Sequence, residues 1–220
     1  MLKELHKEGK SVSIKLVQRL MRRMELKLIT RKKWHYQQAN DLDNFDYPNI
    51  LSQDFSKTAP NQKWWADITY IHTKADGWCY LSSIQDLYSR KIIAHKLSRH
   101  MTANLVNDTL QQAFETRTIT DKLIVHTDLG SQYRSTSFEE LLTERGIRHS
   151  YSRLGCPYDN SVLESFHASL KKKEVYQHHY QNFKAATYAL FSYIEGFYNS
   201  NWTHSSIDYL TPNEKEKLVA

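Results

Sequence analysis

Three short apolar runs, separated by turns of only a few residues, constrain the fold of this 220-residue chain more than any other feature. They lie at residues 65–72, 80–87 and 92–97. Asp76-Gly77 and Ser89 supply turn signals between them, and β-branched and aromatic residues are common within them. Because the connections are short, neighbouring runs are expected to pair antiparallel. The sequence therefore predicts a three-stranded meander.

The next segment alternates between helix and strand patterns. Thr102 precedes a run of apolar residues at helical spacing, and a strand-like run follows at residues 123–127. Ser137 and Glu140 then show capping-box spacing at the start of a second helix, which is followed by a strand at residues 147–151. A meander followed by helix, strand, helix and strand predicts an α/β fold with a mixed five-stranded sheet and flanking helices.

Positive charge is concentrated at the N-terminus. Residues 1–33 contain eleven Lys or Arg and three Glu, a balance of +8 in a chain whose total is +6. Residues 11–28 show the spacing of a short helix, in which Arg19, Arg22 and Arg23 lie between apolar positions. A basic helix attracts polyanions, so we expect these arginines to contact DNA. A solvated basic helix with no specific partner remains the alternative.

The distribution of residue types along the sequence suggests how the chain is divided into segments and where in the cell the protein is found. We predict a basic helical segment at residues 1–33, a polar linker at 34–60 and a core with C-terminal helices at 61–220. The sequence has no long apolar stretch and no apolar core of a secretory signal, so we expect a cytoplasmic protein without a membrane segment. Cys79 and Cys156 form no Cys-x-x-Cys pair, which argues against a disulfide framework or a cysteine-rich zinc module.

Three acidic residues stand in contexts that suit a metal ion. Asp67 interrupts an apolar strand, Asp128 ends another strand just before Gly130, and Glu164 lies on a helix opposite its apolar stripe. Carboxylates are the ligands that Mg²⁺ and Mn²⁺ prefer, and paired ions of this kind drive phosphoryl transfer. We therefore expect two ions, with Asp67 bridging them and the other two acids each completing one side. The alternative is that Asp67 is a paired acid in the core, that Asp128 forms a turn and that Glu164 is an ordinary surface residue.

Two lysines follow Glu164. Lys171 lies seven residues along the helix on the same face, so it is expected to contact a DNA phosphate beside the ions. Lys172 follows it in a run of three lysines, and we expect it to contact DNA as well. An ordinary solvated lysine run explains the spacing equally well.

Histidines and tryptophans near the acids have simpler explanations. His126 and His167 are expected to support the acids at most, because magnesium prefers oxygen ligands. Trp64, Trp65 and Trp78 are expected to be core or interface aromatics rather than platforms for base stacking.

Three segments together resemble a known family. They are Ala59-Pro60-Asn61-Gln62-Lys63-Trp64-Trp65-Ala66-Asp67-Ile68-Thr69-Tyr70-Ile71, His126-Thr127-Asp128-Leu129-Gly130-Ser131-Gln132-Tyr133 and Tyr158-Asp159-Asn160-Ser161-Val162-Leu163-Glu164-Ser165-Phe166. The chain resembles, over about residues 45–215, the second-frame transposases of the IS-three group of bacterial insertion sequences, which carry the retroviral-integrase catalytic core. Thirty-five residues separate Asp128 from Glu164, and Lys171 is the basic residue seven after the Glu, as in that family.

The resemblance implies a ribonuclease-H-like fold, two magnesium ions, cleavage of the transposon end and transesterification into target DNA. It implies an upstream-frame helix-turn-helix protein, often fused by frameshifting, as a partner. Residues 2–33 resemble the back half of a helix-turn-helix. Since transposition joins two DNA ends, we expect a homo-oligomer on DNA. Family members usually carry arginine just before the His-Ser-Ser of residues 204–206, where this chain has Asn201, Trp202 and Thr203, so that arginine's contact is expected to be absent.

Two other functions remain open from the sequence. A ribonuclease-H-type nuclease or a junction resolvase would use the same fold, but neither would join a donor 3′ end to a new strand. A non-catalytic DNA-binding remnant or regulator of transposition would keep the fold without binding divalent ions.

Overall fold

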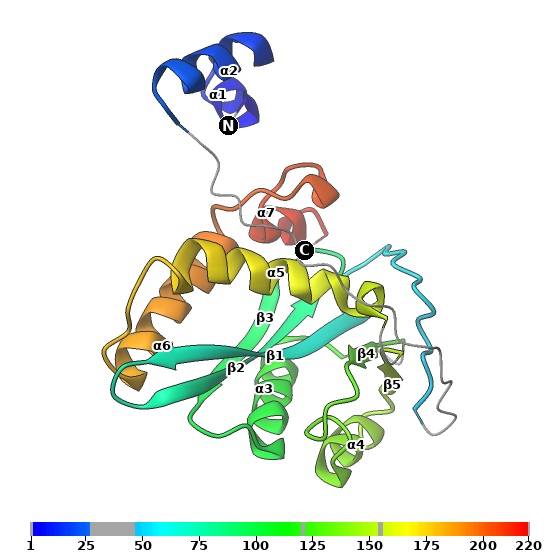
Figure 1. Ribbon diagram of the computed structural model, residues 1–220. Helices are drawn as coiled ribbons and strands as arrows, with labels where there is room; N and C mark the ends of the chain where they lie inside the picture. Colours follow the sequence, from blue (N-terminus) through cyan, green and yellow to red (C-terminus); the bar gives the residue numbers. More distant parts are fainter. Residues whose placement is uncertain (1, 27–46, 120–121, 154–155, 220) are drawn as a thin grey trace. The chain divides into compact units, whose positions relative to one another are not determined.

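The computed structural model describes residues 2–26, 47–119, 122–153 and 156–219, and the chain divides into two compact units, Met1–His35 and Tyr36–Ala220 (Figure 1). The first unit contains α1 (Leu2–Lys7) and α2 (Ile14–Arg23). Ser13 caps α2, because its Oγ accepts a hydrogen bond from the backbone N–H of Leu16 at 3.2 Å. The helix is therefore shorter than the predicted range of residues 11–28.

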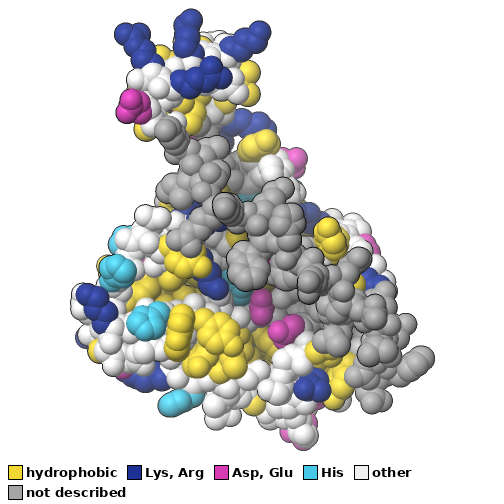
Figure 2. All heavy atoms as spheres, in the orientation of Figure 1, with side chains coloured by type: hydrophobic (Ala, Val, Ile, Leu, Met, Phe, Trp, Pro, Cys, Tyr) yellow, Lys and Arg dark blue, Asp and Glu magenta, His cyan; other side chains and the backbone are white. Residues whose placement is uncertain are grey.

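The basic side chains of α2 face solvent. Arg19, Arg22 and Arg23 are exposed, whereas Val17 is buried. Figure 2 shows Lys and Arg side chains projecting from this unit. The helix is thus amphipathic, with the three arginines free to meet a ligand.

The second unit is built on one five-stranded sheet in the order β3-β2-β1-β4-β5. The strands are β1 (Lys63–Thr73), β2 (Gly77–Asp86), β3 (Ile92–Ser98), β4 (Ile124–Thr127) and β5 (Arg148–Tyr151). β1, β2 and β3 pair antiparallel, whereas β4 runs parallel to both β1 and β5. This arrangement confirms the predicted meander and the mixed five-stranded sheet.

Helices cover both faces of the sheet. They are α3 (Ala103–Thr116), α4 (Thr136–Thr143), η1 (Pro157–Asn160), α5 (Ser161–Leu170), η2 (Lys171–Val175), α6 (Phe183–Phe191), η3 (Ser192–Tyr198), η4 (Ser205–Ile207) and α7 (Pro212–Lys217). In Figure 1, α5 and α6 lie on one side of the sheet and α3 on the other. Trp65 packs with Phe166 on the α5 side, and Trp64 packs with Val106 on the α3 side. Successive residues of β1 thus enter two separate cores.

Helix starts follow capping chemistry, with one difference from the sequence prediction. Thr211 and Glu214 form the complete capping box that opens α7. The cap of α4, however, is Ser135 rather than Ser137: the Oγ of Ser135 accepts a hydrogen bond from the N–H of Phe138 at 3.4 Å. Towards the C-terminus, α6 is continued directly by the wider turns of η3.

The part of the predicted linker that the structure describes, residues 47–60, belongs to the second unit and packs against its sheet and core. The backbone N–H of Tyr151 donates to the carbonyl oxygen of Pro48 at 3.0 Å, and Leu51 belongs to the core on the α5 side. The remainder of the linker, residues 34–46, lies outside the described residues. Among the helices that the structure describes, none is long and apolar enough to cross a membrane.

Candidate active site

The candidate site lies where β1 and β4 separate. These parallel strands pair only at residues 63–65 of β1 and 124–126 of β4. Asp67 therefore follows the last paired residue of β1, and Asp128 follows the last residue of β4. In α/β sheets, ligands bind outside the carboxyl ends of adjacent parallel strands. Helix α5, which carries Glu164, packs against β1 on the face of Trp65 (Figure 1).

Two side chains from the region of α5 hold the carboxylate of Asp67. Its Oδ2 accepts a hydrogen bond from Asn160 Nδ2 at 3.0 Å and lies 3.5 Å from Nδ1 of His167. Its Oδ1 accepts the backbone N–H of Ile68 at 2.7 Å. Asn160 and His167 flank Glu164 in the sequence, so one helix both orients Asp67 and presents the third acid.

The carboxylate of Asp128 fills space that a glycine leaves open. Its Oδ1 accepts the backbone N–H of Gly130 at 2.9 Å, and a Cβ added at Gly130 would lie only 2.8 Å from that oxygen. Burial raises the pKa of Asp128, the Gly130 hydrogen bond opposes this, and the charge of Asp67 adds to the increase. The charge of Asp67 thus influences the protonation of Asp128.

Glu164 is also influenced by Asp67. Burial raises the pKa of Glu164, the charge of Asp67 raises it further, and His167 opposes the change. Asp67 is thus the shared electrostatic neighbour of the other two acids. A divalent cation would relieve this repulsion between carboxylates.

The side chains of the three acids are chemically suited to bind a hard divalent cation. The three acids offer carboxylate oxygens, the ligand type of Mg²⁺ and Mn²⁺. In the part of the chain that the structure describes, however, no three His, Cys, Asp or Glu side chains are arranged closely enough to hold an ion as they stand. The carboxylates would have to turn toward one another to bind it.

Comparisons with known proteins give the family. Two models, each described as an integrase core domain, match residues 57–157 and 145–212. The transposase for insertion sequence element IS904 of Lactococcus lactis is 40% identical over 217 residues, which cover 98% of this chain and 85% of that protein. Transposase InsF for insertion sequence IS3A of Escherichia coli is 38% identical over 97% of this chain and 74% of that protein. The chain belongs to the insertion-sequence transposases of the IS-three group.

Solved structures confirm the fold of this transposase. The simian T-cell lymphotropic virus intasome, solved with PP2A regulatory subunit B56 gamma, aligns with a TM-score of 0.59 and 19% identity over 83% of this chain and 59% of that one. The HTLV-2 integrase catalytic core domain in complex with magnesium (trimeric form) gives a TM-score of 0.54 and 19% identity over 72% and 97%. The ribonuclease-H-like fold is therefore confirmed.

Of the predicted DNA-contacting lysines of the transposase, Lys171 lies near the acids. It is partly buried where α5 continues into η2. Burial lowers the pKa of Lys171, and the charge of Asp67 opposes this change. Lys172 is partly exposed at the next position. Lys173 is held elsewhere, because its Nζ lies 3.4 Å from the ring centroid of Trp202.

His126 is a structural group. It is buried, with Nδ1 2.9 Å from the Oγ of Ser150 and Nε2 3.0 Å from the Oγ of Ser152. Burial lowers the pKa of His126 to about 4, so the imidazole is neutral at physiological pH. Both ring nitrogens are occupied by the serines, which leaves neither free for a metal ion.

Sequence reasoning missed the role of Asn160. Asn160 stands at the N-cap position of α5, yet its side chain makes no capping hydrogen bond and instead contacts Asp67. The adjacent Asp159 is buried and accepts hydrogen bonds from Asn49 at 2.7 Å and Gln53 at 3.0 Å, and it pairs with Arg153. The only sequence signal was a polar pair placed immediately before a helix.

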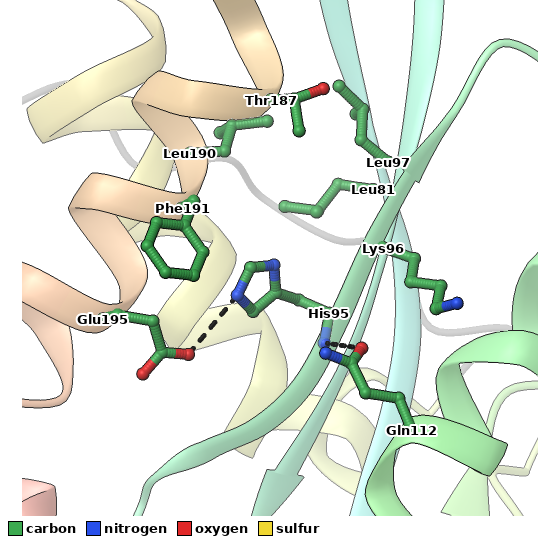
Figure 3. A pocket seen from close by; sticks show the side chains of 9 residues that line it. All are labelled: Leu81, His95, Lys96, Leu97, Gln112, Thr187, Leu190, Phe191 and Glu195. Atoms are coloured by element: carbon green, nitrogen blue, oxygen red, sulfur yellow. Dashed lines mark hydrogen bonds and ion pairs between the residues drawn. The ribbon is translucent and has the colours of Figure 1, made fainter. Parts of the chain in front are cut away.

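A separate pocket lies between β3, α3 and α6 (Figure 3). Within it Nε2 of His95 lies 3.4 Å from Oε1 of Glu195, and the backbone N–H of His95 donates to Gln112 at 3.2 Å. Leu190 and Phe191 line the same space. None of the three acids lines this pocket, so it is distinct from the candidate active site.

Proposed function

We propose that this transposase cleaves DNA at the end of an insertion sequence and joins the freed 3′ end to target DNA, using two Mg²⁺ or Mn²⁺ ions. The observation that carries the proposal is the position of Asp67. It lies where β1 and β4 diverge, α5 side chains orient it, and it influences both Asp128 and Glu164. Membership of a transposase family supports the reaction class.

Different residues of the candidate active site would have different roles in the reaction. Asp67, Asp128 and Glu164 would hold the ions, which when bound activate the attacking oxygen and stabilise the leaving oxygen. Asn160 and His167 keep the carboxylate of Asp67 facing α5. Lys171 would bind a phosphate oxygen beside the acids and so hold the scissile strand in place.

We propose DNA as the partner of both units. Arg19, Arg22 and Arg23 would bind the phosphate backbone through the basic segment of residues 1–33, and Lys172 would add a contact beside Lys171. Residues 34–60 would join this segment to a catalytic core at 61–220. An upstream-frame helix-turn-helix protein, separate or fused, would read the terminal repeats. A homo-oligomer would hold two DNA ends, in the cytoplasm where the DNA is accessible.

A strand-transfer assay with a labelled transposon-end duplex and Mg²⁺ tests the proposal. Asp67→Asn and Glu164→Gln should each lower strand transfer by about a thousandfold or more, because each removes a metal-binding charge. Glu140→Gln is the matched control, since Glu140 is an exposed acid on α4 and should keep its activity. Strand transfer that persists in either site variant contradicts the assignment.

The same assay separates the two other functions. A nuclease or resolvase would give acid-dependent cleavage without any product that joins donor to target. A regulator would show no cleavage, and titration calorimetry in the presence of DNA would detect no Mg²⁺ or Mn²⁺ binding.

A further inference from the structure

Four aromatic rings form a cluster on the α3-facing side of the sheet, near the β1–β2 turn. Tyr70 pairs with Tyr80 and His72 pairs with Trp78 across the two strands, so all four side chains share one face. The ring centroids of Tyr70 lie 5.3 Å from Tyr80 and 6.3 Å from Trp78, and those of His72 and Trp78 are 5.1 Å apart. We call Tyr70, His72, Trp78 and Tyr80 the aromatic platform.

The aromatic platform is open to solvent. Trp78 is 59% exposed and Tyr70 48%, whereas Trp64 and Trp65 of the same sheet are buried. The three tryptophans were expected to lie in a core or an interface. Trp64 and Trp65 are core residues, as expected, whereas Trp78 lies outside both cores. Figure 2 shows hydrophobic side chains gathered over the front of the sheet, beside acidic side chains. A contiguous exposed apolar cluster of this kind marks an interaction surface.

The aromatic platform adjoins the candidate active site. Tyr70 is three residues beyond Asp67 on β1, about 10 Å along the strand, and because side chains alternate its ring lies on the α3 face whereas the carboxylate of Asp67 lies on the α5 face. Met101 connects the platform to the loop after Asp128, because the Tyr70 hydroxyl lies 3.8 Å from its sulfur and Gln132 Nε2 donates to its carbonyl oxygen at 3.3 Å. To reach the platform, a DNA strand that leaves the acids would pass around the edge of β1, which β4 leaves unpaired beyond Trp65.

The charge of this surface suits a polyanion. On this face, the cross-strand pairs from Ile68 to His72 of β1 contain no Asp or Glu. Lys96, which pairs with Ser82 beside Ile68, adds a positive charge next to the rings. Phosphates can thus approach these pairs without meeting one of their own carboxylates, while bases meet aromatic rings.

We propose that the aromatic platform binds unpaired nucleotides of the DNA strand that enters the candidate active site, by stacking their bases on Trp78 and Tyr70. The inference rests on the proposed function and specifies the form of its substrate, which is DNA whose strands have separated beside the cleavage position. Closed duplex would not offer its base faces to the platform, because they are already stacked on one another.

Binding assays in EDTA test this proposal apart from catalysis. The probes are a fluorescein-labelled single-stranded oligonucleotide and the blunt duplex of the same sequence, at one fixed salt concentration, with fluorescence anisotropy as the readout. Loss of one stacked base costs about 1–3 kcal/mol, so Trp78→Ala should raise the single-strand Kd by roughly 5- to 150-fold. The duplex Kd should change by less than about twofold, because its bases are not free to stack.

Three further variants sharpen the result. Trp78→Phe should recover most of the single-strand affinity, because it keeps an aromatic face, and Tyr70→Ala should weaken single-strand binding in the same way as Trp78→Ala. Tyr188→Ala is the matched control, since Tyr188 is an exposed aromatic on α6 and its loss should change neither Kd. Thermal melting checks that Trp78→Ala folds, as expected for so exposed a side chain.

Two outcomes would overturn the proposal. One is that Trp78→Ala weakens single-strand and duplex binding equally, or weakens neither. The other is that Trp78→Ala changes the oligomeric state in sedimentation without changing single-strand affinity, which would assign the platform to contacts between protein copies. Because the assay needs neither metal nor chemistry, it can succeed even if the strand-transfer assay fails.

Discussion

Asn160 donates a hydrogen bond from Nδ2 to Oδ2 of Asp67 at 3.0 Å and so joins the start of α5 to the middle of β1. A side chain that orients a metal-binding carboxylate usually changes affinity or activity by about 10- to 100-fold when it is removed. Asn160→Ala should therefore lower strand transfer by about that factor and raise the Mg²⁺ concentration needed for half-maximal rate.

A Mg²⁺ titration of strand-transfer rates measures this effect. The control is Asn107→Ala, which removes an amide hydrogen bond from Asn107 on α3 to Ser137 on α4, involves none of the three acids, and should leave the titration unchanged. If Asn160→Ala gave the wild-type Mg²⁺ dependence, Asn160 would not position Asp67 for metal binding.

Gly130→Ala should disturb the carboxylate of Asp128. The added Cβ would lie 2.8 Å from Oδ1, so the carboxylate has to move. Because misplacing a reacting group by about 1 Å can cost about a hundredfold in rate, strand transfer should fall by tenfold or more while the melting temperature changes little. Gly196→Ala is the control, since no atom lies within 4 Å of a Cβ added there. Full activity of Gly130→Ala would show that Asp128 tolerates other positions.

Local patterns predicted most of the fold. The three apolar runs of the meander and the short turns between them depend on residues that are close in sequence, and the structure pairs these runs antiparallel as predicted. The cap of α4 was misplaced because Ser135 and Ser137 are both good caps, and only the backbone conformation selects Ser135. The predicted start of a helix is therefore wrong where two nearby residues are equally good caps.

The finer features of the site depend on contacts distant in sequence. The residues of the hydrogen bond between Asn160 and Asp67 are 93 positions apart, and no local signal relates them. The exposure of Trp78 depends likewise on which part of the sheet is left uncovered. A strand pattern assigns Trp78 to a face of the sheet, but the packing of other elements decides whether that face is buried.

Glu164 should make the metal-free protein less stable as the pH rises. Burial and then the charge of Asp67 raise its pKa in the folded state, so the folded protein binds the proton more tightly than the unfolded chain. The resulting stability is present below the ordinary pKa of glutamate and is lost as pH increases through the raised value. In EDTA, Glu164→Gln should thus melt at a higher temperature than wild type at neutral pH, and at the same temperature near about pH 4.

Thermal melts of both proteins at the two pH values measure this difference. Mg²⁺ should then raise the melting temperature of wild type at neutral pH more than that of Glu164→Gln, because the ion offsets the repulsion that the variant lacks. An equal response to Mg²⁺ in the two proteins would argue against Glu164 as a metal ligand.

Lys171 should contribute one phosphate contact near the acids. Lys171 is partly buried, and the charge of Asp67 influences its pKa. A phosphate bound by Lys171 would therefore meet a cation that water screens less than it screens an exposed lysine. Lys171→Ala should weaken DNA binding and reduce the slope of log K against log salt by about one. Lys184→Ala, which removes an exposed lysine from α6, should leave the slope unchanged. Anisotropy titrations over a series of salt concentrations measure both slopes, and a wild-type slope for Lys171→Ala would mean that this lysine serves the fold instead of the substrate.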